Sequence, residues 1–416
     1  MASLAYPIKT SIAALLAFLL AAAPAAAASF SAKRGINLDL WTTWPDETRW
    51  NDRSVILPFP EWRRSVGEAD LAALKAAGFD FVRMPVDPAA LLSGQTAGFD
   101  DLLYESVLDS ARLANAAGLK VIVDLHAIPA GGNRAIGTYQ LLEDAALFDR
   151  YVEAVRRMAR TVSREDPALV ALELMNEPVS ACEGAEAAAW AGRLKRLYAA
   201  ARASATRTTL VLSGACWGGA EGLAALDPRD FPDDNLIWSF HSYAPFLLTH
   251  QGATWTDGFV RWVTGLPYPP YSVPRAALDG IVAGIKEKIA AEASWTERQG
   301  QLSYFDELLA QTDTPERLAA TMAEPFDRVA AWAKKHGIAA NDILLGEFGM
   351  IRQEYGNDHV VPAAQRAAYY RDMIAIAERH GFAWSLWSYG GAFGVVEEFD
   401  GRKAEPDVVD MVRALP

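Results

Sequence analysis

The chain contains eight short apolar runs, rich in β-branched and aromatic residues, spread along most of its 416 residues. Most of them are close to continuously hydrophobic, as is typical of strands that are buried on both faces of a sheet. The runs are "GINLDL" (35–40), "FDFVRMPV" (79–86), "LKVIVDLHA" (119–127), "LVALELMNEP" (169–178), "TLVLSGACW" (209–217), "LIWSFHSY" (236–243), "ILLGEFGM" (343–350) and "FAWSLWSYGG" (382–391). No other feature limits the possible folds as strongly.

Stretches with helical periodicity separate these runs. Residues 68–78 and 104–118, for example, carry apolar side chains at three- and four-residue steps and end in glycine, a common helix stop. Strand and helix in alternation, with eight strands, predict a parallel sheet that closes into a (β/α)8 TIM barrel. An open doubly wound sheet is the alternative, but no glycine-rich phosphate loop follows the first run.

One interval is longer than a loop and a helix require, because 100 positions separate Tyr243 from Ile343. We interpret approximately 244–315 as an insertion after the sixth strand, with helical pieces around 275–292 and 301–310. In a barrel this loop rises beside the mouth where ligands bind. The alternative is a surface subdomain with no part in binding.

The first 28 residues resemble a secretory signal peptide. Lys9 precedes an apolar run from Ile12 to Ala23, and small residues with A-x-A spacing follow near Ala26 to Ala28. We therefore expect a signal peptide over 1–28, a single catalytic domain over 29–416, and a secreted or periplasmic protein. An uncleaved N-terminal anchor is the alternative, although the run is short for a bilayer span.

The net charge of −13 argues against a nucleic-acid partner, because binding to a phosphate backbone requires a basic surface. We expect a monomer without membrane contact after signal cleavage. The histidines and the two cysteines form no metal-binding motif, so we expect neither a metal nor another cofactor. Cys182 and Cys216 follow neighbouring predicted strands, and they could form a disulfide or remain two free thiols.

Polar side chains stand at the carboxyl ends of six of the eight predicted strands, the end at which barrels carry their functional groups. Any one of them has a structural explanation, such as an ion pair or a buried histidine. Six at one end of one barrel favour a functional site. The residues are Arg83, His126, Asn176, Glu177, His241, Tyr243, Glu347 and Trp387.

Glu177 and Glu347 follow strands four and seven, which face each other across the mouth of an eight-stranded barrel. Two carboxyl groups on either side of a glycosidic bond are what glycoside hydrolysis requires, one as proton donor and one as nucleophile or base. The neighbouring arginine, histidines and tyrosine would give the two carboxyl groups different pKa values. A tryptophan offers an apolar face to a sugar ring.

These motifs resemble glycoside hydrolase family 5, the cellulase family of retaining (β/α)8 hydrolases, over nearly the whole mature chain. Asn176-Glu177-Pro178 is similar to the family's acid/base motif, and Glu347 in "LLGEFGM" is similar to its nucleophile. The remaining active-site positions match Arg83 in "FVRMP", His126 in "VDLHA" and His241 and Tyr243 in "FHSYAP". Trp387 matches the tryptophan beside the reacting sugar, with Trp384 as the competing choice.

The resemblance implies a double displacement with retention of the anomeric configuration. Glu347 is expected to attack the anomeric carbon while Arg83 and the hydroxyl of Tyr243 keep it ionised, and Glu177 to protonate the leaving oxygen. Asn176 is placed to bind the sugar 2-hydroxyl, and the two histidines to bind hydroxyls and tune the carboxyl groups. Among other carboxylates, we expect Asp124 to orient His126 or to lie in the barrel wall, and Glu173 to belong to an interior ion pair.

An oligo- or polysaccharide substrate follows from this assignment, and we expect an endo-β-1,4-glucanase. A β-mannanase, an exo-acting β-glucosidase, an exopolysaccharide hydrolase and a non-catalytic glycan-binding barrel are the alternatives. Several tryptophans could stack on sugar rings in outer subsites or serve only for packing. They are Trp41, Trp44, Trp217, Trp255 and Trp262.

Overall fold

The computed structural model describes residues 29–39, 44–57, 66–128, 135–256, 258–399 and 401–416. The predicted signal peptide over 1–28 and Trp41 lie outside these residues. Eight parallel strands form a closed barrel in which each strand pairs with the next and β8 pairs with β1, so the TIM-barrel prediction is confirmed. The strands are β1 (Arg34–Asn37), β2 (Phe81–Val86), β3 (Lys120–Leu125), β4 (Val170–Glu173), β5 (Leu210–Ser213), β6 (Leu236–His241), β7 (Ile343–Glu347) and β8 (Ala383–Leu386).

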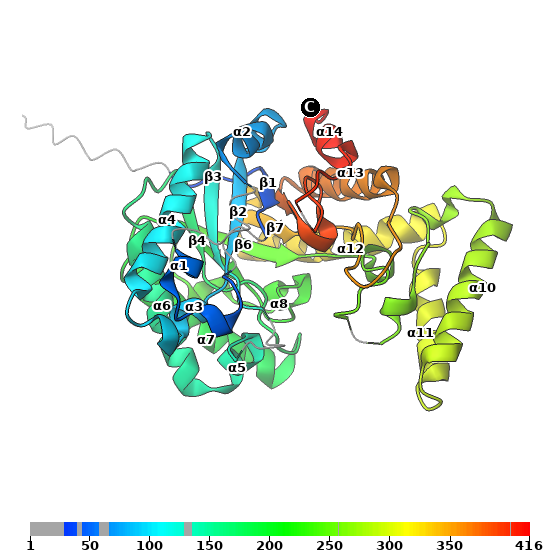
Figure 1. Cartoon of the computed structure of the whole chain (residues 1–416), viewed down its shortest axis with the longest axis horizontal. Helices are drawn as coiled ribbons and strands as arrows, with labels where there is room; N and C mark the ends of the chain where they lie inside the picture. The colour runs from blue at the N-terminus through cyan, green and yellow to red at the C-terminus, as the bar shows by residue number, and fades with distance from the viewer. Residues whose placement is uncertain (1–28, 40–43, 58–65, 129–134, 257, 400) are drawn as a thin grey trace, which may run out of the picture.

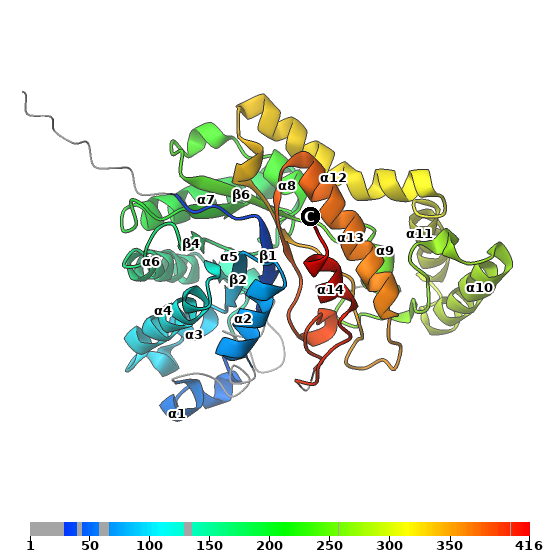
Figure 2. The ribbon, with the colours of Figure 1, turned by 90° about the horizontal axis from the view of Figure 1, so that it is seen from above.

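Helices surround the barrel, and the longer ones lie where the sequence predicts them (Figures 1 and 2). Apolar side chains of these helices and of the outer barrel wall form the main hydrophobic core. The helices are α1 (Arg53–Ile56), α2 (Glu68–Ala76), α3 (Ala89–Leu92), α4 (Asp100–Ala116), α5 (Thr138–Glu143), α6 (Ala145–Val162), α7 (Gly184–Arg202), α8 (Ala220–Ala224), α9 (Phe246–Thr249), α10 (Arg275–Glu292), α11 (Arg298–Ala310), α12 (Pro315–His336), α13 (Ala363–His380) and α14 (Asp407–Arg413). None of the helices in the described part of the chain combines the length and hydropathy that a membrane span requires.

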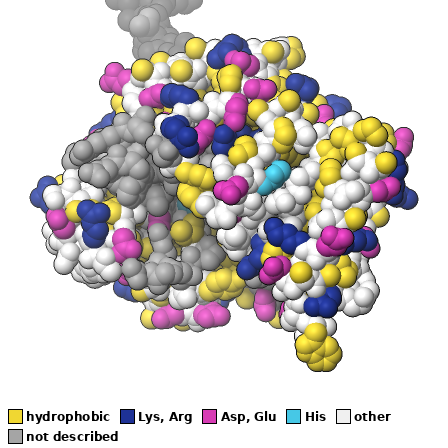
Figure 3. All heavy atoms as spheres, turned by 45° about the vertical axis from the view of Figure 1, so that its right-hand side comes forward, with side chains coloured by type: hydrophobic (Ala, Val, Ile, Leu, Met, Phe, Trp, Pro, Cys, Tyr) yellow, Lys and Arg dark blue, Asp and Glu magenta, His cyan; other side chains and the backbone are white. Residues whose placement is uncertain are grey.

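The insertion after β6 is confirmed, and its two main helices, α10 and α11, form a hairpin that projects from one side of the barrel (Figures 1 and 2). Phe259, which precedes the hairpin, packs edge-on against Tyr304 and Phe305 of α11. On the face shown in Figure 3, hydrophobic, acidic and basic side chains are interspersed. The helix α12 then returns the chain to β7.

Side chains inside the barrel lie in layers, because alternate residues of a strand point to the same face. The layer at the amino-terminal end is apolar and forms a hydrophobic cluster separate from the main core. Gly35 of β1 has no side chain there, and the ring of Phe81 fills the space, since a Cβ at Gly35 would lie 2.2 Å from that ring. The cluster consists of Phe30, Phe81, Ile122, Ala171, Val211, Ile237, Leu344 and Ala383.

The next layer, two residues further along each strand, is polar. Phe81 is followed by Arg83, Ile122 by Asp124 and Ala171 by Glu173, and the register pairs Asp124 with Glu173. Asn37, Ser213, Ser239 and Ser385 occupy the equivalent positions on β1, β5, β6 and β8. One further step of two residues leads to His126, His241 and Trp387 at the mouth.

Candidate active site

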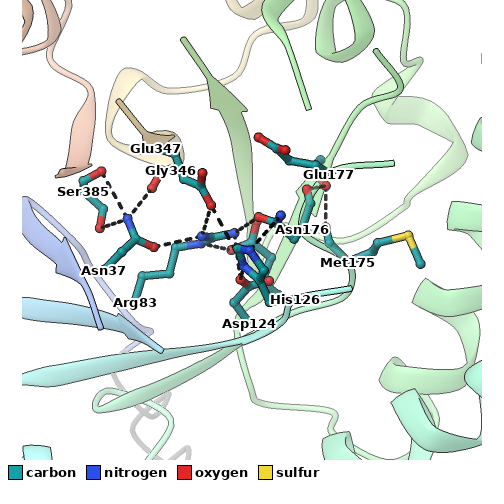
Figure 4. Close-up of polar contacts among 12 residues, drawn as sticks. Asn37, Arg83, Asp124, His126, Met175, Asn176, Glu177, Gly346, Glu347 and Ser385 are labelled. Carbon is teal, nitrogen blue, oxygen red and sulfur yellow. Dashed lines mark hydrogen bonds and ion pairs between the residues drawn. The ribbon is translucent and has the colours of Figure 1, made fainter. Parts of the chain in front are cut away.

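Arg83 is fully buried at the centre of the polar layer, and each of its five N–H groups has a partner (Figure 4). Its Nε donates to Glu173 at 2.7 Å, and its Nη1 donates to Glu347 at 2.7 Å and to Asn37 at 2.9 Å. Its Nη2 donates to Asn176 at 2.7 Å and forms an ion pair with Asp124 at 2.9 Å. The expected interior ion pair of Glu173 is therefore present. One guanidinium thus contacts three carboxyl groups, and burial raises the pKa of two of them, Asp124 and Glu173.

The amide of Asn176 connects Arg83 to His126. Its Oδ1 accepts from the arginine, so its Nδ2 is the atom that lies 3.2 Å from Nε2 of His126, and it donates there. Nδ1 of His126 then carries the ring proton and donates to Asp124 at 2.6 Å, the orienting contact expected for Asp124. Burial lowers the pKa of His126 to about 4, so this imidazole is neutral near pH 7. Every donor in this chain of contacts faces an acceptor.

Glu347 stands at the end of β7 with both carboxylate oxygens engaged. Its Oε1 accepts from Arg83, and its Oε2 accepts from the hydroxyl of Tyr243 at 2.9 Å, as expected from the sequence. A Cβ at the preceding residue, Gly346, would lie 2.5 Å from Oγ of Ser239 and 2.9 Å from Nε2 of His241. Glycine at position 346 therefore leaves room for the histidine beside the carboxylate.

Glu177 follows β4 and is the more accessible of the two glutamates, with 24% of its side chain exposed against 5% for Glu347. Its Oε1 lies 2.7 Å from Nδ1 of His241. Nε2 of His241 is buried and has no hydrogen-bond partner among the described residues, so a proton on Nδ1, donated to Glu177, leaves no buried N–H unsatisfied. Burial also lowers the pKa of His241 to about 4, which keeps the ring neutral.

The environment of Glu177 favours its protonated form. Burial raises the pKa of Glu177 to about 7, and the negative charges of Asp124 and Glu173 add to the increase, while Arg83 opposes it. A carboxyl group with this pKa holds its proton in a substantial fraction of molecules at neutral pH, as a proton donor must. Glu347 instead accepts two hydrogen bonds, one from Arg83 and one from Tyr243.

The two glutamates share one small space at the mouth. An oxygen of Glu177, a ring nitrogen of His241 and an oxygen of Glu347 lie within 4.8 Å of one another. These three groups are close enough to share a metal ion, and they are the groups that the hydrolytic chemistry would use. A gap of about 5–5.5 Å between the carboxyl groups is typical of retaining glycosidases, whereas inverting enzymes separate them by about 6.5–9.5 Å.

The structure separates the competing tryptophans. Trp384 is fully buried and packs edge-on against Phe79 and Phe348, whereas Trp387 is half-buried and stacks on His126 with ring centroids 5.4 Å apart. Trp387 is thus the one beside the candidate site. Among the outer tryptophans, Trp44 is buried in the core and Trp262 is half-buried against it, so both serve packing. Trp217 and Trp255 are 44% and 52% exposed.

Asn37 is a site residue that the sequence analysis missed. Its Oδ1 accepts from Arg83, and its Nδ2 donates to the backbone oxygen of Gly346 and to Oγ of Ser385, both at 3.0 Å (Figure 4). It thereby ties β1 and β8 to the peptide that precedes Glu347. An available signal was its position two residues after an inward-facing residue of β1, the spacing that also places Arg83 and Asp124.

The fold and the paired carboxyl groups together define a barrel of the glycoside hydrolase class. Comparison with known families agrees, because residues 47–393 match the family model described as cellulase, glycosyl hydrolase family 5. The match covers more than half of the chain, which therefore belongs to this family and is a glycoside hydrolase.

Individual relatives are distant. The chain is 25% identical over 365 residues to Endoglucanase C of Acetivibrio thermocellus, which covers 86% of this chain and 91% of the relative. It is 24% identical over 343 residues to Endoglucanase 3 of Fibrobacter succinogenes, covering 80% of this chain but only 47% of that longer protein.

Solved structures share the fold at lower identity. An endoglucanase from the hyperthermophile Thermotoga maritima has a TM-score of 0.62 at 20% identity, covering 91% of this chain and 96% of its own. The cellulose synthase subunit Z from Clostridioides difficile has a TM-score of 0.63 at 19% identity, covering 92% of this chain and 99% of its own.

Proposed function

We propose that this protein is a retaining endo-β-1,4-glucanase in which Glu347 is the nucleophile and Glu177 the acid/base. The observation that carries the proposal is the proximity of the two glutamates, whose oxygens lie within 4.8 Å of each other. Their surroundings differ in the direction that the two roles require. Glu347 is held by Arg83 and Tyr243, whereas burial raises the pKa of Glu177 to about 7.

The proposed reaction has two steps. Glu347 attacks the anomeric carbon while Glu177 protonates the leaving oxygen, so the glycosidic bond breaks as a glycosyl–carboxylate ester forms. Formation of the ester removes the negative charge of Glu347, and this lowers the pKa of Glu177. Glu177 then takes a proton from water, which hydrolyses the ester and releases the sugar with its original configuration.

The neutral side chains around the glutamates would orient the sugar. Asn176 lies between Arg83 and His126 and is placed to contact the 2-hydroxyl, and Trp387 offers a ring face for the pyranose. These roles, like those of the glutamates, are part of the proposal.

A β-1,4-glucan is the substrate that the relatives favour, because several of them are endoglucanases. A β-mannan is the second candidate, since the Thermotoga maritima endoglucanase has also been crystallised with mannotriose. Incubation with cellulose derivatives, mixed-linkage glucan and mannan, followed by measurement of reducing sugars, tests both. We expect release from β-1,4-glucan, and release only from mannan would move the assignment to mannanase.

The same assay tests the residues. Glu347→Ala and Glu177→Ala should each lower the turnover number by at least about a hundredfold. A matched control is Glu378→Gln, which alters an ion pair with Arg34 at the opposite end of the barrel and should leave activity unchanged. Normal turnover in either active-site variant, or an inverted product anomer in proton NMR, would refute the proposal.

We further propose that the protein is exported. The signal-like segment over 1–28 supports export, and so does the disulfide between Cys182 and Cys216, because disulfides persist mainly in oxidising compartments.

A further inference from the structure

The disulfide between Cys182 and Cys216 joins the loop after β4 to the loop after β5. The first of these loops carries Asn176 and Glu177, and Cys182 lies five residues after the glutamate. As residues, Cys182 is exposed and Cys216 is half-buried. The cross-link therefore lies beside the proposed acid/base residue.

The loop after β5 adopts an unusual backbone conformation at the cross-link. Among all the residues that the structure describes, Cys216 and Trp217 are the only non-glycine residues with positive φ, at 60° and 55°. This left-handed region is unfavourable for residues that carry a Cβ. Two backbone hydrogen bonds accompany the disulfide, from the amide of Trp217 to the oxygen of Pro178 at 3.0 Å and from the amide of Gly219 to the oxygen of Cys216 at 2.9 Å.

This turn packs directly against the side chains of Glu177 and His241. The oxygen of Gly218 accepts from the backbone amide of His241 at 2.9 Å. A Cβ at Gly218 would lie 3.6 Å from Nδ1 of His241 and 3.7 Å from Cγ of Glu177. A turn that relaxed out of the left-handed conformation would move the backbone that holds both partners of the 2.7 Å contact between the histidine and the glutamate.

The same turn presents Trp217 to solvent near the glutamate. Its side chain is 44% exposed and meets the ring of Tyr139 edge-on, with centroids 6.3 Å apart. In the proposed function the proton donor stands on the side of the departing group, and the hydrogen bond from the amide of Trp217 to the oxygen of Pro178, the residue after Glu177, places Trp217 on the same side. The turn therefore affects two features that matter only for a leaving group that is itself a sugar, namely proton donation and stacking.

We infer that Cys182 and Cys216 are positioning residues whose disulfide holds the left-handed turn at 216–217. Through this turn, the disulfide keeps Glu177, His241 and Trp217 in the geometry needed to expel a sugar leaving group. The inference rests on the proposed function. It implies that loss of the bond impairs cleavage of natural linkages selectively, because an activated aryl leaving group needs neither a proton nor a stacking surface.

The test compares two variants that both lack the disulfide. Cys182→Ala/Cys216→Asn keeps a residue that tolerates the left-handed region, whereas Cys182→Ala/Cys216→Val places a β-branched residue there. Both are assayed well below their melting temperatures with cellotetraose and with 2,4-dinitrophenyl β-cellobioside. On cellotetraose we expect kcat/KM to fall about tenfold or more in the valine variant and clearly less in the asparagine variant. On the aryl glycoside we expect both to stay within about twofold of the wild type, because that leaving group departs unprotonated.

Reduction provides an independent measurement on the unmodified protein. Dithiothreitol transfers two electrons to the bond and leaves two thiols as it becomes a cyclic disulfide. It should lower the cellotetraose rate of the wild type reversibly and leave both variants unchanged. Three results would overturn the inference: an equal fall in kcat/KM on the two substrates, the same kcat/KM in the two variants, or no fall in either variant. A wild type that cleaves neither substrate would refute the proposed function itself, and this inference with it.

Discussion

Replacement of Glu177 by glutamine removes the proposed proton donor while keeping the size of the side chain. The amide oxygen of the new side chain can still accept from Nδ1 of His241, which lies 2.7 Å from the carboxyl group in the wild type. The change therefore isolates proton transfer from packing. General acid catalysis typically contributes about 10²–10⁴ in rate, which corresponds to about 2.7–5.5 kcal/mol of transition-state stabilisation. We expect kcat/KM for cellotetraose to fall within that range.

The pH dependence of kcat/KM is a more specific test of proton donation by Glu177. Burial raises the pKa of Glu177 to about 7, and the free enzyme needs this group protonated. In the wild type, kcat/KM for cellotetraose should therefore be highest below pH 7 and fall about tenfold for each pH unit above it. Neither neighbouring histidine accounts for such a limb, because burial lowers the pKa of His126 and of His241 to about 4.

Asp124 and Asp39 are the competing groups, because burial raises the pKa of each to about 7, in Asp124 against the effect of its ion pair with Arg83. The glutamine variant separates Glu177 from both. With 2,4-dinitrophenyl β-cellobioside it should show a rapid burst of phenolate, then slow turnover, and a kcat/KM that is flat between pH 6 and about 9. Azide should restore turnover and give the β-glycosyl azide, because it attacks the glycosyl-enzyme without a base.

Three results would refute this reasoning. Wild-type rates on cellotetraose would show that Glu177 donates no proton. An alkaline limb that persists in the variant would assign the titration to another group, with Asp124 the first choice. An α-azide product would exclude retention. Thermal unfolding of the variant, measured in parallel, should remain close to that of the wild type.

Two further variants test the side chains that hold Glu347, the proposed nucleophile. Arg83→Lys replaces five N–H donors by three, so at least two buried acceptors lose their hydrogen bond to residue 83. The free energy of unfolding should therefore fall by about 2–6 kcal/mol in urea titrations. A change below about 1 kcal/mol would contradict the central role of Arg83 in the polar layer. Tyr243→Phe removes only the 2.9 Å hydrogen bond to Glu347, a charge-assisted contact worth about 1.5–3 kcal/mol, so kcat/KM should fall about 10- to 150-fold in steady-state assays. A Tyr243→Phe variant as active as the wild type would show that this bond contributes nothing to the reaction.

The barrel could be predicted because parallel strands covered by helices appear in the sequence as apolar runs. The residues at which the strands end could not be predicted. The prediction extends the fourth strand to Pro178, whereas β4 ends at Glu173. Leu174 and Met175 continue the apolar run and are fully buried past the end of β4, and the amide of Leu174 still donates to the oxygen of Val211 at 3.2 Å. Burial thus continues past the last residue of β4, since α6 covers the start of the loop as well, with the hydroxyl of Tyr151 donating to the oxygen of Leu174 at 2.7 Å. Hydrophobicity alone does not mark where the ladder stops.

The candidate site was predictable where a polar residue follows an apolar strand, as with Glu177 and Glu347. Asn37 was missed because an asparagine in a short first strand resembles a turn residue. Its role depends on the closure of β1 against β8, which brings it to Ser385. The pairing of Cys182 with Cys216 and the choice between Trp384 and Trp387 likewise depend on contacts between segments that sequence spacing does not fix.

The apolar layer at the amino-terminal end of the barrel, which includes Phe30 and Phe81, closes the floor beneath the polar layer. The polar layer is consequently closed off from solvent at that end of the barrel. In the proposed reaction, the water of the second step must therefore arrive from the mouth, the side from which the departing fragment also leaves. A fragment that lingers there obstructs the incoming water, and attack of its freed hydroxyl on the glycosyl-enzyme only re-forms the original linkage, so slow departure would slow net hydrolysis.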